Sequence, residues 1–413
     1  MRPDPAGPPR TLVVGAGHRL IAALQGHLPA GSVVVLEHPQ LLTDPAVRRR
    51  LDQLSVVGDV LAAEELYGDD VASVIGRLPG AVSRVVPSTD EQSVIASAIL
   101  AEKLALPGVG SAAARVFADK IALRQAAEAA GLANPRWREV VDGPSLPAAV
   151  RGLGCAEFVL KPTARSGSQG VLLLDQSDDL GVAWSQCTTA RGRHRVEPPP
   201  PTRYLVEERV FGPEVSVECL ARDGEVLFCN VTRKHVVAGR HPVEIGHVVP
   251  ADLSGPLVRR LTAAMRRLVA ATGYETGVLH GEWILVDGEP VLVECAARIP
   301  GDRITTLLSR AYGVPFVAAY AGLLSGASAA PELPVGLPGA PVAAAAVRFV
   351  TPAPGIVESV GGTDAAAAVP GVYDVTIDVS AGAPPASPAH AATSRAGRDP
   401  PRPGPGTRRN PRP

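Results

Sequence analysis

The run "VLVECAARIP" (residues 291–300) places a carboxylate at the end of an apolar strand and an arginine four residues later. Its first three residues are apolar and predict a buried strand that ends on Glu294. A carboxylate in such a position costs free energy unless a cation or hydrogen-bond donors compensate it. The run therefore predicts that Glu294 binds a partner and that Arg298 lies near the same site.

A second strand precedes this one and supplies a second carboxylate. In "HGEWILVDGEPVLVECAAR" (residues 280–298), Asp287 and Gly288 stand between two apolar runs, which is a strong signal of a β-hairpin. Pairing brings Glu282, which His280 flanks, close to Glu294 on one face. Two such carboxylates repel unless a hard divalent cation such as Mg²⁺, which takes oxygen ligands and shares them with phosphates, lies between them. Two solvated glutamates on an edge hairpin are the alternative.

The N-terminal part alternates strands with helices, which predicts a small parallel α/β sheet. The expected strands cover residues 11–17, 32–38 and 83–90, and the expected helices cover residues 44–54 and 92–104. The glycine pair Gly15 and Gly17 lacks the third glycine of a dinucleotide-binding fingerprint, because Leu20 stands there. We therefore expect a plain strand-to-helix turn, with a nucleotide-binding loop as the alternative.

Farther along, closely spaced short strands predict antiparallel sheet. They cover residues 157–162, 170–175, 203–210, 214–221 and 225–232. Helices are expected over residues 112–130, ending at Gly131, over 254–272 and over 305–312, and a linker over 191–203. Residues 341–355 and 373–380 predict a small closing β element, and the Pro- and Arg-rich end from residue 381 predicts a disordered tail.

Composition excludes several classes of protein. The chain has 413 residues, enough for two to four domains, with a formal net charge of -1 and 4% aromatic residues, so nucleic acid is not an expected partner. The five scattered cysteines form no C-x-x-C pair, so we expect free thiols rather than a disulfide framework or a zinc site. The sequence shows no signal peptide and no membrane span, which predicts a cytoplasmic protein without a membrane partner.

Two further motifs offer ligands for a nucleotide. In "VLKPTARSGSQGV" (residues 159–171), Lys161 ends a strand and a loop of small residues follows, whose backbone N–H groups can bind phosphate. The small residues of this loop are Ser166, Gly167, Ser168 and Gly170. The loop is not a P-loop, and a hairpin turn is the alternative. In "YLVEERVFGPEVSVE" (residues 204–218), Glu207 and Glu214 can accept hydrogen bonds from an adenine amino group or from ribose hydroxyls.

In their order along the chain, these motifs resemble the ATP-grasp superfamily. "FADKIALRQAAEAAGL" (residues 117–132) resembles the family's helix with its first nucleotide lysine, here Lys120, and the resemblance covers residues 11–380. It implies an N-terminal α/β domain, a two-part clamp for ATP and a small C-terminal element. The implied boundaries are residues 1–10 (disordered), 11–112, 113–330 (parts 113–203 and 204–330), 331–380 and 381–413.

The resemblance also implies roles for single residues. Lys120 and Lys161 would contact ATP phosphates together with the loop of small residues. Glu207 and the backbone near Val210 would bind adenine, and Glu214 the ribose. Glu282 and Glu294 would hold Mg²⁺, for which Mn²⁺ can substitute. Many members have Asn two residues after the second glutamate, where this chain has Ala296, so the binding of a second Mg²⁺ is in doubt.

Within the superfamily, the chain resembles the L-amino-acid ligases of the alanine–anticapsin ligase type. The resemblance rests on "HPVEIGHVVPADL" (residues 241–253) together with "ECAARIPGD" (residues 294–302). It implies that the E-x-G-H element, from Glu244 to His247, lines the site where the amino acids meet, and that Arg298 faces the acyl phosphate.

"PSTDEQSV" (residues 87–94) would offer Glu91, or Asp90, to a substrate amino group. The alternatives for these substrate residues are a surface turn for His247, a helix cap for Asp90 and a strand-end salt bridge for Arg298.

The implied activity is an ATP-dependent carboxylate–amine ligase that forms an amide through an acyl phosphate and releases ADP and phosphate. The partners would be ATP and amino acids, and the resemblance leaves a homodimer open. The alternatives are a purine-pathway or biotin-carboxylase-like ligase, against which the E-x-G-H element argues, and a catalytically silent ATP-binding protein. The end of the chain after Gly382 departs from the family, as either a truncated or a divergent tail.

Overall fold

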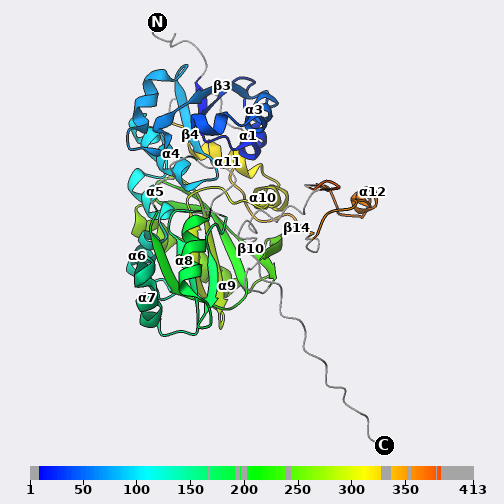
Figure 1. Cartoon of the computed structure of the whole chain (residues 1–413). Helices are drawn as coiled ribbons and strands as arrows, with labels where there is room; N and C mark the ends of the chain where they lie inside the picture. Colours follow the sequence, from blue (N-terminus) through cyan, green and yellow to red (C-terminus); the bar gives the residue numbers. More distant parts are fainter. Residues whose placement is uncertain are drawn as a thin grey trace, which may run out of the picture.

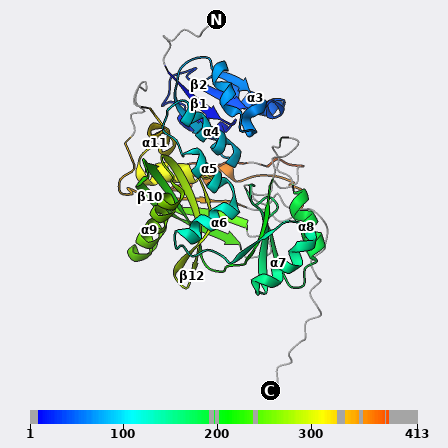
Figure 2. The same ribbon diagram turned by 90° about the vertical axis from the view of Figure 1, so that its left-hand side faces the viewer.

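The computed structural model describes residues 9–165, 167–190, 196, 202–237, 243–326, 336–350, 355–377 and 379–382. Three β-sheets organise this part of the chain: a four-stranded parallel sheet, a four-stranded antiparallel sheet and a six-stranded antiparallel sheet. The parallel sheet lies at one end of the molecule, and the two antiparallel sheets lie next to each other at the other end (Figures 1 and 2). The predicted α/β class with antiparallel elements is confirmed.

The N-terminal domain is the parallel sheet with helices on both faces. Its elements are β1 (Arg10–Val14), α1 (His18–Leu24), β2 (Val33–Glu37), α2 (Pro39–Leu42), α3 (Pro45–Asp52), β3 (Val57–Ala62), the 3-10 helices η1 (Glu64–Tyr67) and η2 (Val71–Arg77), β4 (Val82–Pro87) and α4 (Glu91–Lys103). The strand order is β3-β2-β1-β4. Strand β3 was not predicted, because most of its side chains are only half-buried and it lacks a continuous apolar run.

The glycine-containing loop after β1 is a strand-to-helix turn. The buried Glu37 carboxylate accepts a hydrogen bond of 2.7 Å from the backbone N–H of Ala16. A Cβ atom at Gly15 or Gly17 would lie 2.6 or 2.4 Å from Ser88 on the strand-end loop of β4, so both glycines are needed for this close approach. The turn is therefore fixed by contacts within the domain.

The single helix predicted over residues 112–130 is wrong, because the structure has two helices there. These are α5 (Ser111–Ala118) and α6 (Lys120–Ala129). Asp119 between them has extended backbone angles, and its Oδ1 accepts from the N–H groups of Ile121 and Ala122 at 2.9 and 3.0 Å. An aspartate that caps a new helix in this way ends the preceding one. The break starts α6 at Lys120.

The smaller antiparallel sheet has helices on one face. Its elements are β5 (Trp137–Val140), η3 (Gly143–Ser145), α7 (Leu146–Leu153), β6 (Glu157–Pro162), β7 (Leu172–Asp175), α8 (Leu180–Thr189) and β8 (Tyr204–Glu208), in the strand order β5-β8-β6-β7. Side chains such as Phe158 and Leu160 pack against Leu146 and Val150 of α7. Lys161 and Glu207 point to the other face, where Glu207 meets Arg124 of α6.

The larger antiparallel sheet is the structural centre of the second half. Its strands are β9 (Glu214–Arg222), β10 (Glu225–Val237), β11 (Val243–Val249), β12 (Gly277–Val286), β13 (Glu289–Ala296) and β14 (Ala345–Arg348), in the order β13-β12-β9-β10-β11-β14. Helix α9 (Gly255–Thr272) covers one face together with α5 and α6. The predicted turn at Asp287 and Gly288 is confirmed, since both residues have positive φ (49° and 82°) and join β12 to β13.

The C-terminal elements join the two halves. Helices α10 (Ile304–Tyr312) and α11 (Phe316–Leu323) share a buried apolar cluster with α1 and β1 of the N-terminal domain and with β9 and β12 (Figure 1). The predicted closing β element is only partly present. Strand β14 pairs with β11 in the large sheet, but the described residues between 373 and 380 form no strand; the short helix α12 (Thr363–Ala367) precedes them.

Further predictions concern the cysteines, membrane spans and the ends of the chain. All five cysteines are unpaired, as predicted. No helix among the described residues combines the length and apolar character that crossing a bilayer requires. Most of the predicted linker (residues 191–195 and 197–201), the N-terminal residues 1–8 and the tail from residue 383 lie outside the described residues; Arg10, expected in the disordered start, begins β1.

Replacing the capping residue tests the helix break. Asp119→Ala removes two capping hydrogen bonds and should lower the free energy of unfolding by about 1 kcal/mol. Asp119→Asn keeps a capping oxygen and loses only the charge that faces the half-exposed Arg203, 3.0 Å away. Urea unfolding of both variants measures the difference. Equal losses would show that the charge, and not the cap, stabilises this junction.

Candidate active site

The polar face of the large sheet follows from the two-residue period of its strands. On β9, Val215, Val217 and Cys219 point into the core beneath α9, so Glu214, Ser216 and Glu218 point to the opposite face. Neighbouring strands continue this polar face in register with Asn230 and Thr232 on β10 and His280 and Glu282 on β12. The face is largely buried, so each charge on it needs a partner.

Glu282 and Glu294 stand opposite each other on β12 and β13, as the hairpin predicts. Each carboxylate meets a lysine: Glu282 Oε2 lies 3.2 Å from Lys234 Nζ, and Glu294 Oε1 lies 3.0 Å from Lys120 Nζ. The sheet therefore presents a pair of acidic groups flanked by two ammonium groups. Oxygen donors on adjacent strands are what a hard divalent cation takes as ligands.

Lys120 connects this pair of acids to the loop of small residues. Its buried Nζ also donates a 2.9 Å hydrogen bond to the backbone oxygen of Arg165. In the loop, Gly167, Ser168 and Gly170 all have positive φ, between 55° and 77°. A Cβ at Gly170 would lie 2.8 Å from the carbonyl oxygen of Cys187, so glycine is required there. Ser166 lies outside the described residues.

A second buried cluster joins Lys161, Glu207 and Arg124. Lys161 Nζ contacts Glu207 Oε1, while Arg124 donates to Glu207 Oε2 from Nε and Nη2 at 3.1 and 2.9 Å. Burial raises the pKa of Glu207, but the two cations outweigh it and hold the pKa below its usual value. Arg124 was not predicted; the signal was its position four residues after Lys120, on the same helix face.

Lys234 is the second functional candidate that the sequence analysis missed. Its buried Nζ lies 2.7 Å from Glu244, 3.2 Å from Glu282 and 3.7 Å from Glu214. Burial lowers its pKa, but the three carboxylates raise it well above the usual value, so Lys234 is charged. The alternation of the polar residues Asn230, Thr232 and Lys234 in the middle of β10 was the available signal.

A hydrogen-bond network centred on Glu218 reaches the carboxylate of Glu282 through His280. The fully buried Glu218 accepts from Ser216 and Thr232 (both 2.6 Å) and from Asn230 (2.8 Å), and it lies 3.1 Å from His280 Nδ1. The other ring nitrogen of His280 lies 3.3 Å from Glu282 Oε1. Burial lowers the pKa of His280, but the two carboxylates raise it to about 9, so the ring is a cation between them.

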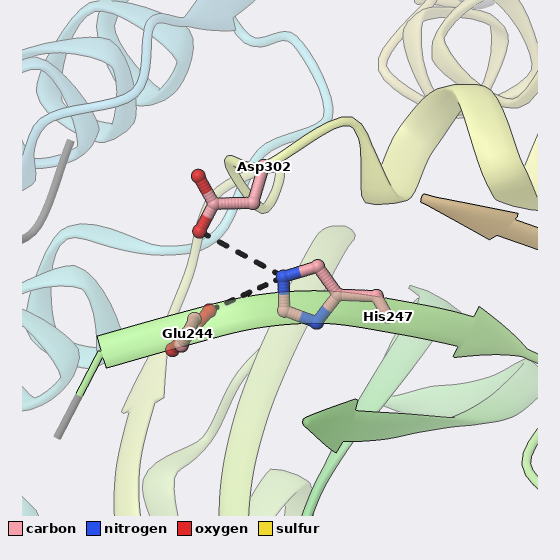
Figure 3. A group of neighbouring side chains, drawn as sticks. All are labelled: Glu244, His247 and Asp302. Atoms are coloured by element: carbon pink, nitrogen blue, oxygen red, sulfur yellow. Dashed lines mark ion pairs between the residues drawn. The ribbon is translucent and has the colours of Figure 1, made fainter. Parts of the chain in front are cut away.

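The E-x-G-H element lies on β11, beside this face. His247 is fully buried, so the alternative of a surface turn is wrong. Its Nε2 lies 3.2 Å from Glu244 Oε2 and 3.9 Å from Asp302 Oδ2 (Figure 3). Burial raises the pKa of Glu244, but Lys234 and His247 bring it down to about 2. Asp302 was inside the quoted motif and received no role, because its contact with β11 depends on the fold.

Glu91 and Arg298 form an ion pair with each other. Arg298 donates from Nε and Nη2 to Glu91 Oε1, both at 3.4 Å, and the two residues line a small pocket with Phe117. Asp90 caps α4 through a 2.8 Å bond from the N–H of Ser93, which agrees with the helix-cap alternative. Val210 is half-buried in the segment between β8 and β9.

The sequence is similar to a known domain family and to known proteins. Residues 155–306 match the family described as ATP-grasp domain. The chain is 27% identical over 360 residues to uncharacterized protein y4rH of Sinorhizobium fredii, covering 84% of this chain and 70% of that protein. It is 22% identical over 331 residues to the alanine–anticapsin ligase of Bacillus subtilis (strain 168), covering 74% and 66%. The matches thus span about two thirds of these two relatives.

Solved structures share the fold. The L-amino acid ligase from Bacillus licheniformis superposes with a TM-score of 0.70 at 19% identity, covering 92% of this chain and 90% of that chain. Phosphoribosylglycinamide synthetase from Anaerococcus prevotii gives 0.59 at 17%, covering 85% and 84%. The predicted α/β fold, with an N-terminal parallel sheet followed by antiparallel sheets, is confirmed.

The contrast between two neighbouring ion pairs can be tested by mutation. Arg124→Met leaves Glu207 with one cation and two backbone oxygens of β13 without donors, so it should lower the free energy of unfolding by about 3–5 kcal/mol. Arg136→Met breaks the adjacent ion pair between Arg136 and Glu208. The side chain of Arg136 is 59% exposed, so this variant should lower the free energy of unfolding by less than about 1 kcal/mol. Denaturant melts of both proteins measure the difference. Comparable losses would contradict a structural role specific to Arg124.

Proposed function

We propose, from the ATP-grasp domain that this chain contains at residues 155–306, that the protein is an ATP-dependent ligase that joins two amino acids. A carboxylate would be phosphorylated by ATP to an acyl phosphate, which an amine would then attack to form an amide and release phosphate. Support at the level of sequence comes from the alanine–anticapsin ligases, although their identity to this chain is low.

One observation carries this proposal: a row of charged side chains connects the loop of small residues to the E-x-G-H element. Lys120 pairs with Glu294, whose register partner on the next strand is Glu282; Glu282 pairs with Lys234, and Lys234 pairs with Glu244. The proposed phosphate-binding end would thus lie next to a carboxylate-rich end. A ligase needs this adjacency, because the phosphoryl group must pass from a nucleotide to a second substrate.

The nucleotide would lie between the two antiparallel sheets. Lys120 and Lys161 would neutralise phosphate oxygens, aided by backbone N–H groups of Gly167, Ser168 and Gly170. Glu207 with the backbone near Val210 would bind the adenine, and Glu214 the ribose. Lys234 adds a third cation on the same face. Ser166 is part of the proposed loop on sequence grounds alone.

The paired carboxylates fit a divalent cation. Glu282 and Glu294 offer oxygen atoms from opposite positions of two strands, and lysines already balance their charge. When bound, Mg²⁺, or Mn²⁺ in its place, supplies positive charge between the phosphates. Ala296 contributes no ligand atom, so the chain offers these two carboxylates and leaves further positions to water or phosphate.

The substrate end would be built from Arg298, Glu91, Glu244 and His247. Arg298 has a planar fork of donors that suits the oxygens of a carboxylate or an acyl phosphate. Its present partner, Glu91, would then be free to hold a substrate ammonium group. Closing the clamp around these groups would keep water from the acyl phosphate.

A catalytically silent ATP-binding protein is the second candidate, and Ala296 is the observation that favours it. Other ATP-grasp ligases, of the purine or biotin-carboxylase kind, share the clamp, but the buried Glu244–His247 pair on β11 argues for an amino-acid ligase.

Phosphate release tests the proposed function. With ATP and Mg²⁺, release should require a pair of amino acids, and Glu294→Ala should lower the rate at least about 100-fold. Glu289→Ala is the matched control, because Glu289 lies on the same strand and its side chain is 64% exposed. A coupled phosphate assay over amino acids, singly and in pairs, measures both. Tight ATP binding with no release for any pair would favour the silent binder.

A second prediction concerns the histidine behind the metal ligand. His280→Gln removes the contact that orients Glu282 and should raise the KM for Mg²⁺ about 10-fold while kcat at saturating Mg²⁺ changes little. Initial rates against Mg²⁺ concentration, with a thermal melt in parallel, separate the two effects. A lowered melting temperature with an unchanged KM for Mg²⁺ would assign His280 a purely structural role.

A further inference from the structure

Three side chains that can each ligate a metal converge beside the proposed Mg²⁺ site but share no residue with it. Glu244 and His247 come from β11, and Asp302 comes from the turn between β13 and α10 (Figure 3). Lys234 links the two places, since it contacts both Glu282 and Glu244. Glu244 and His247 belong to the proposed substrate end, so a metal ion bound there together with Asp302 would deepen that proposal and go beyond its phosphate chemistry.

The distances suit a bound ion. His247 Nε2 lies 3.2 Å from Glu244 Oε2 and 3.9 Å from Asp302 Oδ2, and all three ligand atoms lie within 4.8 Å of one another. Ligands about 2.1 Å from a tetrahedral ion are separated by about 3.4 Å. The two distances from Nε2 differ from this spacing by about 0.2 and 0.5 Å, whereas the two carboxylate oxygens, which lie up to 4.8 Å apart, would move together by as much as about 1.4 Å to close around an ion.

His247 supplies a second observation. The ring is fully buried, and within the described part of the chain neither ring nitrogen makes a well-oriented hydrogen bond. Nε2 points toward the two carboxylates and has only its ion-pair contacts with them (Figure 3). The ring also makes an edge-to-face contact with Phe349. A cation between the carboxylates would give this buried nitrogen a directed bond in place of two poorly oriented contacts.

We propose that Glu244, His247 and Asp302 bind one divalent transition-metal ion of the zinc or manganese class. One imidazole nitrogen and two carboxylate oxygens suit these ions better than Mg²⁺, which prefers oxygen alone. Lys234 contacts the other oxygen of Glu244, Oε1, and so leaves Oε2 available while fixing the carboxylate. Three protein ligands leave at least one coordination position open for water or a substrate atom.

Cobalt binding tests the site in the full-length protein without nucleotide or Mg²⁺. Equilibrium dialysis against Co²⁺ should find one tightly bound ion per chain, with visible absorption bands that Zn²⁺ abolishes by displacement. Asp302→Asn should weaken binding at least about 10-fold, and His247→Ala should do the same. Asp287→Asn is the matched control, because Asp287 also has positive φ (49°, against 50° for Asp302) but lies in the β12–β13 turn. Its Co²⁺ binding should equal that of the unchanged protein.

Asp302→Asn keeps the proposal testable if the buried His247→Ala variant fails to fold, since Asn tolerates the left-handed conformation. Absence of stoichiometric Co²⁺ and Zn²⁺ binding would overturn the proposal, and so would binding that both variants retain. Neither result depends on the ligase reaction. Amino-acid-dependent phosphate release without a bound transition metal would leave the proposed function standing and remove the metal site.

Discussion

The buried guanidinium of Arg124 holds together the parts from which the candidate site is built. It belongs to α6, binds the carboxylate of Glu207 on β8 of the small sheet, and donates to the backbone oxygens of Leu292 and Val293 on β13 of the large sheet. One side chain thereby connects both sheets and the helix that begins at Lys120. Its desolvation is compensated only by this full set of partners, so the relative position of the three elements is tightly constrained.

The second constraint is the two-residue period of the large sheet. Alternate residues of β9 pack beneath α9, and the remaining ones form a polar face that the rest of the protein then covers. Glu218 shows how such a face is stabilised: its two oxygens face three groups from the neighbouring strands β10 and β12 and the hydroxyl of Ser216 on its own strand. A carboxylate with this full set of partners is held in one position. It orients the ring of His280, and that ring in turn orients the carboxylate of Glu282.

Local signals predicted much of this arrangement. The dipeptide at Asp287 and Gly288 predicted the hairpin, and the hairpin predicted that Glu282 faces Glu294. Sequence patterns could not predict that Asp119 divides a helix, since its neighbours favour helix on both sides and the cap forms only when the chain changes direction. Nor could they reveal the partners of Arg124, Lys234 and Asp302, because these contacts depend on how separate elements pack; Lys234, for example, meets carboxylates from three other strands. The packing of elements against one another, rather than residue type, accounts for what could not be predicted.

Lys234 gives the arrangement a property that none of its neighbours has alone. Three carboxylates, Glu214, Glu244 and Glu282, share its single ammonium group as a common counter-ion. Any ligand that draws one of them away strengthens the hold of the other two and alters the charge that His247 experiences. Because coupling between sites is reciprocal, a ligand that binds at Glu282 and one that binds at Glu244 would each change the affinity of the other. Such a shared charge would couple the two places without any movement of the backbone.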